Sequence, residues 1–245
     1  MAVLVTRPSP DNLRTADALR ALGFDVMLAP MLRFEPLPLS AKPSGDLGAV
    51  IATSANALRA VVPQLSGSPL TSLPLFVVGA QTAAAARDAG FAEVISADGD
   101  AERLRELIVD SAVRRVFDPS RSLLYLAGSD ISRDLASELS ERGFHVVTET
   151  VYRMAPVKAL PREVCDGFAA DEIEAVLHYS RRSAAAFVAA ARAEGVEISA
   201  LSVPQCCISD SVAQVLREAE AVRVTVAEHP DEQKLLEGLT RALRS

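Results

Sequence analysis

Short apolar runs alternate along the chain with longer stretches in which apolar residues recur at helical spacing. The run Ala49–Ala52, for example, is followed by the polar residues Thr53, Ser54 and Asn56, and then by a helical pattern. Buried strands of about four to six residues that alternate with helices of about ten to fourteen are typical of parallel sheets covered by helices on both faces. The pattern therefore predicts an α/β fold.

The same pattern occurs twice in the chain. Three pairs of segments match, namely those that begin at residues 3 and 123, 49 and 175, and 74 and 204, with offsets of 120, 126 and 130 residues. In the first pair, Gly23 and Gly143 each end a predicted helix. A repeat whose offset grows slowly indicates a duplicated unit with loop insertions. The sequence thus predicts two similar lobes, each a parallel sheet flanked by helices.

The first pair also predicts where two helices begin. Ser9 is expected to cap the first helix, with Pro10 in the first helical position. Asp130 is expected to cap the matching helix of the second copy. Leu13 and Leu22 keep the helical spacing of the first helix.

Proline-bearing stretches after the matching second strands predict where the chain passes between the lobes. Pro36 and Pro38 follow the first copy, and Pro156 follows the second. If both stretches cross, one lobe comprises residues 1–36 and 157–245, and residues 37–156 form an inserted lobe with hinge connectors at both ends. Two such connectors predict a two-stranded hinge and a cleft between the lobes.

The residue composition narrows the class of protein. With 245 residues, of which 49% are hydrophobic, the chain is long enough for two small cores. Its net charge of −7 and the lack of a Lys/Arg tract argue against a nucleic-acid partner. The opening MAVLVTRPSP lacks the pattern of a signal peptide, and no apolar run reaches the ~18 residues that a membrane helix needs. Cys165 and the adjacent Cys206 and Cys207 lack zinc-binding spacing and favour a cytoplasmic protein, with the adjacent pair buried in a strand.

Polar turns follow the predicted strands at their carboxyl ends, where ligands of open parallel sheets bind. Short hydroxyl side chains cap helices there and leave backbone N–H groups free for an anion, so even an acidic protein can hold one. Plain helix capping is the alternative for each turn, and a solvated surface is the alternative for the arginine pair at 181–182. The candidate substrate-binding residues in these turns are Arg7, Thr53, Ser54, Asn56, Gly79, Thr82, Gly128, Ser180, Arg181, Ser183 and Ser211.

Few residues in the sequence suit strong acid–base chemistry. No HExxH motif, nucleophile elbow or carboxylate pair is present. His178 ends a strand near the turn at Ser180, with a structural role as the alternative, and His145 and His229 are expected at the surface. Tyr152 closes the second-copy strand near the predicted hinge. Its counterpart in the first copy is a leucine, so its role is either functional or that of an aromatic plug.

Six segments of the sequence match those of a known family. They are VLVTRP from Val3, VIATSANAL from Val50, VVGAQTAAAARDAG from Val77, LLYLAGSDISRDLASELSERGFHV from Leu123, VY at Val151 and AEHPDEQKLLEGL from Ala227. In this order and spacing they resemble uroporphyrinogen-III synthase over essentially the whole chain. The resemblance implies a lyase that cyclises the linear tetrapyrrole hydroxymethylbilane, with loss of water and inversion of ring D, on the way to haem. It also implies two α/β lobes joined by a two-stranded linker, an active site in the cleft between them, and no cofactor or metal.

The resemblance further implies which residues act on the substrate. Backbone amides and small hydroxyl groups are expected to hold its acetate and propionate arms. Tyr152 matches the tyrosine that assists departure of the substrate hydroxyl, so it is the expected catalytic residue. Ser54, Thr82 and Ser180 match positions at the cleft.

Two turns depart from the family pattern. Many relatives have Gly-Pro-Thr-Thr-Ala where this chain has residues 209–213, and small residues or proline where it has Arg181 and Arg182. The missing glycine restricts backbone approach and Val212 removes a hydroxyl group, so the carboxylate contacts of the discontinuous lobe are expected to differ from those of relatives. An arginine pair can offset lost amide contacts, so the reaction is expected to be the same.

The expected partners follow from the same resemblance. They are the linear tetrapyrrole substrate and, transiently, the preceding enzyme of the pathway, with no nucleic acid and no membrane. A cytoplasmic monomer is expected. Two alternatives stay open, a non-catalytic cytoplasmic bilobal module that binds an anionic ligand, and an enzyme resembling sugar-phosphate isomerases.

Overall fold

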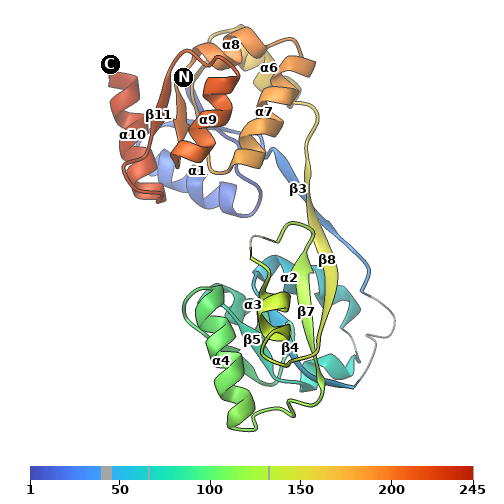
Figure 1. Ribbon diagram of the computed structural model, residues 1–245. Helices are drawn as coiled ribbons and strands as arrows, with labels where there is room; N and C mark the ends of the chain where they lie inside the picture. Colours follow the sequence, from blue (N-terminus) through green and yellow to red (C-terminus); the bar gives the residue numbers. More distant parts are fainter. Residues whose placement is uncertain (40–45, 66, 132, 245) are drawn as a thin grey trace. The chain divides into compact units, whose positions relative to one another are not determined.

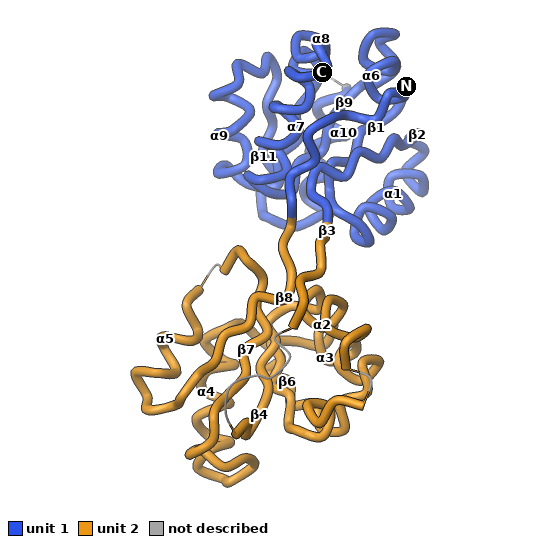
Figure 2. Tube along the Cα trace, turned by 90° about the vertical axis from the view of Figure 1, so that its right-hand side faces the viewer, with its two compact units in different colours: residues 1–33, 155–245 blue, residues 34–154 orange. Residues whose placement is uncertain are grey.

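The computed structural model (Figure 1) describes residues 1–39, 46–65, 67–131 and 133–244. It divides into unit 1, Met1–Arg33 with Ala155–Ser245, and unit 2, Phe34–Met154. The chain crosses between the units twice, within β3 (Leu32–Pro36) and β8 (Val146–Pro156), as Figure 2 shows. Unit 2 is therefore inserted into unit 1, and the prediction of an inserted lobe is confirmed.

The two connecting strands pair with each other at the edge of one sheet. The amide of Leu37 donates to the carbonyl of Val151 at 2.8 Å, and the amide of Val157 donates to the carbonyl of Met31 at 2.9 Å. These bonds join later residues of one strand to earlier residues of the other, which makes the pair antiparallel. The predicted two-stranded connection is thus confirmed.

Unit 1 contains a five-stranded sheet in the order β11-β10-β9-β1-β2, and all of its pairings are parallel. Its strands are β1 (Ala2–Val5), β2 (Asp25–Leu28), β9 (Ile173–His178), β10 (Gln205–Cys207) and β11 (Val224–Val226). Its helices are α1 (Asp11–Ala21), α6 (Arg162–Ala169), α7 (Arg181–Ala193), α8 (Glu197–Ser202), α9 (Asp210–Glu218) and α10 (Glu232–Arg244).

Unit 2 carries a six-stranded sheet in the order β3-β8-β7-β4-β5-β6. Besides β3 and β8, its strands are β4 (Leu47–Ala52), β5 (Leu75–Val77), β6 (Val94–Ser96) and β7 (Ser122–Gly128). Its helices are α2 (Ala55–Val61), α3 (Ala80–Asp88), α4 (Ala101–Val113) and α5 (Leu135–Ser140), with short 3-10 turns η1 (Val62–Gln64) and η2 (Pro69–Ser72).

The two sheets repeat the same architecture. Reversed, the second order is β6-β5-β4-β7-β8-β3. Its first five strands match the five strands of unit 1 one for one along the three segment pairs of the sequence, and β3 is an additional edge strand. The unit β5-α3-β6 and the unit β10-α9-β11 have element bounds that differ by 130 residues throughout. Gly23 and Gly143 both have φ of 88°, a conformation that favours glycine after a helix. The predicted duplication is confirmed.

Both faces of the unit 1 sheet are covered by helices. One apolar cluster includes residues of α6, α7, α8 and α9, and the other includes residues of α1 and α10. Leu4 belongs to the first cluster, whereas Val3 and Val5 belong to the second, because side chains alternate along a strand. Cys206 and Cys207 divide between the clusters in the same way, and both are buried free thiols, as predicted.

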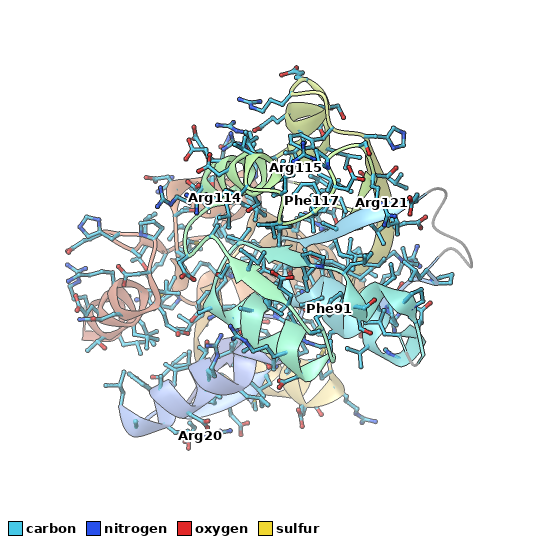
Figure 3. All side chains as sticks on the ribbon, turned by 90° about the horizontal axis from the view of Figure 1, so that it is seen from below. Arg20, Phe91, Arg114, Arg115, Phe117 and Arg121 are labelled. Carbon is cyan, nitrogen blue, oxygen red and sulfur yellow. The ribbon has the colours of Figure 1, made fainter. Side chains whose placement is uncertain are left out.

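The unit 2 sheet lies between α2 and α3 on one face and α4 and α5 on the other. Phe76 and Phe117 pack edge to face in the second layer, with ring centroids 5.6 Å apart. Figure 3 labels Phe117 together with Arg114 and Arg115 of the same connection, which are exposed. Burial of such an aromatic side chain contributes about 1.5–3 kcal/mol, so Phe117 anchors the otherwise polar connection from α4 to β7.

The starts of two helices differ from the prediction. α1 begins at Asp11 with Pro10 in the N-cap position, and proline has no side-chain acceptor; the amide of Asn12 donates to the carbonyl of Pro8 at 3.2 Å. The predicted cap Ser9 is therefore wrong. α5 begins at Leu135, where Asp134 accepts from the amide of Ser137 at 3.0 Å, so the predicted cap Asp130 is also wrong. In both cases the helix begins later in the chain than the sequence pattern predicts.

The apolar positions of α1 do not all face the core. Leu13 is 51% exposed and Leu22 is 57% exposed, whereas Ala16 and Leu19 are fully buried. The helix thus contacts the sheet along a narrower stripe than its leucines suggest. Helical spacing alone does not set the width of that stripe.

His178 is a fully buried histidine at the end of β9. The Nε2 atom of His178 lies 2.9 Å from Oε1 of Gln205. The side-chain Nε2 of Gln205 donates to the carbonyls of Ala200 and Val203, which fixes its Oε1 as an acceptor. His178 therefore carries its proton on Nε2, and its Nδ1 has no partner among the described residues. Burial lowers the pKa of His178 from 6.5 to about 4. The structural role considered for this histidine fits its position.

We expect the buried His178 to make the protein less stable as the pH falls. The folded chain resists protonation down to about pH 4, whereas the unfolded chain takes up a proton below pH 6.5. The free energy of unfolding should therefore fall by about 2 kcal/mol between pH 7 and pH 5. Urea unfolding at several pH values measures this slope. In His178→Leu, the free energy of unfolding should no longer fall by this amount between pH 7 and pH 5. An equal dependence on pH in both proteins would contradict the lowered pKa of His178.

Candidate functional site

Three neighbouring strands of unit 2 end in the predicted polar turns. β7, β4 and β5 are adjacent and parallel, so their carboxyl ends lie along one edge of the sheet. The turn after β4 leads into α2, and the turn after β5 leads into α3. The sheet therefore brings the candidates in the turns after β4, β5 and β7 to the same edge.

Ser54 caps α2 at this edge. Its Oγ accepts from the amide of Asn56 at 3.2 Å, so the hydroxyl serves the helix, as the capping alternative predicted. The hydroxyl of Thr53 lies 3.1 Å from that of Tyr125. Burial raises the pKa of Tyr125, so this phenol keeps its proton and can donate to Thr53. The cap satisfies only some of the free N–H groups of α2.

α3 begins without a side-chain cap. Gly79 occupies the N-cap position, and a Cβ built on it would have no atom within 4 Å. The first turn of this helix thus offers open space above amide donors, which suits a carboxylate. Thr82 lies in the first turn of the helix but is only 7% exposed.

A β-bulge sets the position of Tyr152. Ala127 pairs with Thr150 and Gly128 with Tyr152, so Val151 is the extra residue. Neighbouring strand residues normally face opposite sides, yet Val151 and Tyr152 both pack against the apolar cluster beneath α2 and α3. The bulge therefore turns the side chain of Tyr152 to the same face of the sheet as that of Val151. β8 continues to Pro156, so the prediction that Tyr152 closes its strand is wrong.

The ring of Tyr152 lies directly over Gly128. An ideal Cβ on Gly128 would be 2.6 Å from Cζ and 2.8 Å from Oη of Tyr152, so any side chain at this position would force the ring or the backbone to shift. Phe34 supports the ring from β3 at a centroid distance of 5.7 Å. Within the described part of the chain, the hydroxyl of the half-buried Tyr152 makes no hydrogen bond. Among the described residues it is a positioned donor without a protein acceptor.

An ion network holds the segment that follows Gly128. Glu138 of α5 accepts from Nη2 of Arg133 at 3.0 Å and from Nη1 of Arg105 at 2.8 Å. These hydrogen bonds, first from Arg133 and then from Arg105, lower the pKa of Glu138 to about 2. The network ties the start of α5 to α4. Sequence reasoning missed it because Arg105 in α4 and Glu138 in α5 are 33 residues apart in the chain.

The matching edge of unit 1 carries the second set of candidates. Ser180 caps α7 by accepting from the amide of Ser183 at 3.1 Å, and the hydroxyls of these two serines lie 2.8 Å apart. Arg181 is exposed and forms no ion pair with any described residue. Ser211 is exposed in the first turn of α9, where its hydroxyl lies 3.0 Å from that of Ser209.

Arg7 follows β1 and is engaged within the chain. Its Nη1 lies 3.3 Å from Oε1 of Glu232, its Nη2 lies 3.4 Å from Oδ2 of Asp11, and its guanidinium carbon lies 4.6 Å from the centroid of the Tyr179 ring. The sequence pointed to Arg7, but it did not predict that Glu232, Thr15 and Tyr179 contact it. Only the fold brings these residues together.

Comparison with known proteins identifies the family. The family model described as "Uroporphyrinogen-III synthase HemD" matches residues 14–237. The chain belongs to the uroporphyrinogen-III synthase family. As a member, it is a cyclising lyase that acts on hydroxymethylbilane in tetrapyrrole biosynthesis. No curated protein matches the chain.

Solved uroporphyrinogen-III synthases share the fold. The uroporphyrinogen-III synthetase from Helicobacter pylori has a TM-score of 0.62 at 20% identity, over 99% of this chain and 99% of that chain. A mutant uroporphyrinogen III synthase from the extremely thermophilic bacterium Thermus thermophilus has a TM-score of 0.53 at 18% identity, over 100% of this chain and 99% of that chain. At such identities the likeness concerns the fold.

The candidate residues at the two sheet edges are mostly backbone and small polar groups, with Arg7 and Arg181 in unit 1. Among the described residues, no three His, Cys, Asp or Glu side chains are grouped to hold a metal ion. The helices, as far as the structure describes them, are too short or too polar to cross a membrane. The arrangement offers amide donors for carboxylates and, at Tyr152, one positioned phenol.

Proposed function

We propose that this chain closes hydroxymethylbilane with inversion of ring D, giving uroporphyrinogen III, and that Tyr152 assists departure of the substrate hydroxyl. The observation that carries the proposal is the hydroxyl of Tyr152, which is fixed by the bulge and by Gly128 and has no internal acceptor in the described chain. Because this donor is already held in place, little free energy is needed to orient it in the transition state.

The reaction proceeds through a cationic intermediate. The hydroxyl leaves as water with a proton supplied by the phenol, which gives an azafulvene. The far pyrrole ring attacks through its substituted carbon to form a spiro intermediate, which fragments and closes again with that ring inverted. The closing ring loses one proton, so no proton is consumed overall. The enzyme mainly has to hold the ends of the substrate in the less accessible arrangement.

We further propose that the two sheet edges hold the acid arms of the substrate. In unit 2, the open first turn of α3 at Gly79, with Thr82, and the first turn of α2, with Thr53, Ser54 and Asn56, supply amide and hydroxyl donors. In unit 1, the donors are Arg7, Ser180, Arg181, Ser183 and Ser211. Gly128 takes part by making room for Tyr152.

The setting of the enzyme is also a proposal. We propose a cytoplasmic monomer that contacts the preceding pathway enzyme transiently. Hydroxymethylbilane closes spontaneously to the symmetric isomer, so a short transfer between the two enzymes would protect it. Free thiols at Cys165, Cys206 and Cys207 support a reducing compartment.

The decisive experiment supplies hydroxymethylbilane to the protein, oxidises the products and separates the isomers by chromatography. We expect an excess of the type III isomer, formed faster than the spontaneous reaction. Formation of the type I isomer alone, at the spontaneous rate, would contradict the proposal and favour a non-catalytic module that binds an anionic ligand.

A further inference from the structure

A second polar cluster in unit 1 is built around one carboxylate oxygen. Oε1 of Glu232 is 3.3 Å from Nη1 of Arg7 and accepts from Oη of Tyr179 at 3.0 Å. The hydroxyl of Thr15 donates to the same oxygen. Three donors, from the segment after β1, from α1 and from the segment after β9, thus converge on a single acceptor from α10. Such convergence is the usual chemistry of a carboxylate-binding site.

The donors are held in place independently of Glu232. Thr15 is fully buried, and its Oγ1 lies 3.3 Å from the carbonyl oxygen of Asp11. The guanidinium of Arg7 stacks on the ring of Tyr179 with its carbon 4.6 Å from the centroid. Burial raises the pKa of Tyr179, so its phenol keeps its proton and stays a donor. The three donors therefore form a preorganised group.

The side chain of Glu232 is more exposed than those of Arg7 and Thr15. Its side chain is 37% exposed, and the contact with Arg7 at 3.3 Å is longer than the ~2.7–2.9 Å of a strong charge-assisted hydrogen bond. Arg7 also forms a second ion pair, because its Nη2 lies 3.4 Å from Oδ2 of Asp11. Glu232 begins α10, so its side chain can turn outward without any change in the helix.

We propose that Arg7, Thr15 and Tyr179 form a binding site for an alkyl carboxylate, and that Glu232 is an internal occupant which such a ligand displaces. The donors follow the carboxyl ends of β1 and β9 or lie in α1, on the edge of the sheet assigned to substrate. The ligand would be one acid arm of the linear tetrapyrrole. That identification rests on the proposed function, whereas the carboxylate site itself does not.

The first test does not depend on activity. Thermal unfolding of Glu232→Ala is followed in sodium acetate, sodium propionate and sodium chloride at equal ionic strength. We expect the two carboxylates to raise its Tm in a saturable way, because they bind only the folded chain. The wild-type protein and Glu232→Ala/Arg7→Gln should show only the general salt effect. If Tm depended on the three salts in the same way in all three proteins, the proposed carboxylate site would be refuted.

The second test asks whether Glu232 competes with substrate. Glu232→Gln keeps the size of the side chain but removes its charge, so we expect KM for hydroxymethylbilane to fall about fivefold, with kcat within about twofold. Glu197→Gln, which removes the same charge from an exposed pair with Arg192, should leave both constants unchanged. A KM that stays the same or rises in a folded Glu232→Gln protein would show that Glu232 is a structural partner of Arg7.

The two proposals can fail separately. Carboxylate stabilisation of Glu232→Ala without type III product would keep the site and refute the proposed function. Type III product without carboxylate stabilisation or a change in KM would keep the function and refute the site.

Discussion

Replacing Tyr152 by phenylalanine is expected to slow turnover by about 10- to 100-fold, the usual size of acid–base assistance by one group. The change removes only the hydroxyl, which makes no hydrogen bond within the described chain. Folding should therefore be almost unaffected. Because the ring remains over Gly128 and beside Phe34, the loss should fall on kcat rather than on KM. Single-turnover rates with isomer analysis measure the effect.

Tyr125→Phe supplies the matched control. This tyrosine lies on the neighbouring strand β7, and its hydroxyl is 3.1 Å from that of Thr53. We expect its loss to cost about 1 kcal/mol of stability, the worth of one hydrogen bond, and to change turnover much less than the loss at Tyr152. Equal rates for Tyr152→Phe and the wild-type protein would remove Tyr152 from the reaction.

Much of the fold follows from local patterns in the sequence. The apolar runs of β4 and β9 and the helical spacing of α3 and α9 depend on neighbours in the chain, so the duplicated α/β architecture was predictable. Ser54 and Ser180 were predicted as caps because a cap also acts locally. Ser9 failed in the same role, because the helix begins one residue later than predicted and Pro10, which has no side-chain acceptor, occupies the N-cap position.

The site was less predictable because it depends on long-range pairing. The bulge at Val151 arises from the register between β7 and β8, which no local pattern encodes. Arg7 was correctly placed after a strand, yet its partner Glu232 lies 225 residues further along the chain. The expectation that substrate carboxylates bind Arg7 therefore stays a prediction, and Glu232 would compete with them for this arginine.

Gly128→Ala should have the broadest effect of the substitutions at this edge. The new methyl group would lie 2.6 Å from Cζ of Tyr152, so the ring must move. Overpacking of this kind costs about 1–3 kcal/mol of folding free energy. Since the phenol moves with the ring, we expect turnover to fall at least as far as in Tyr152→Phe. Urea unfolding and single-turnover rates measure the two effects.

Gly238→Ala makes the same chemical change in α10, where no atom lies within 4 Å of the added carbon. It should raise stability slightly, by ~0.5–1 kcal/mol, because alanine favours the helix. A double-mutant cycle then identifies the cause of the loss at Gly128. Once Tyr152→Ala has removed the ring, Gly128→Ala should no longer destabilise the protein. A cost that persists without the ring would mean that Gly128 is needed by the backbone of β7, and that the bulge alone positions Tyr152.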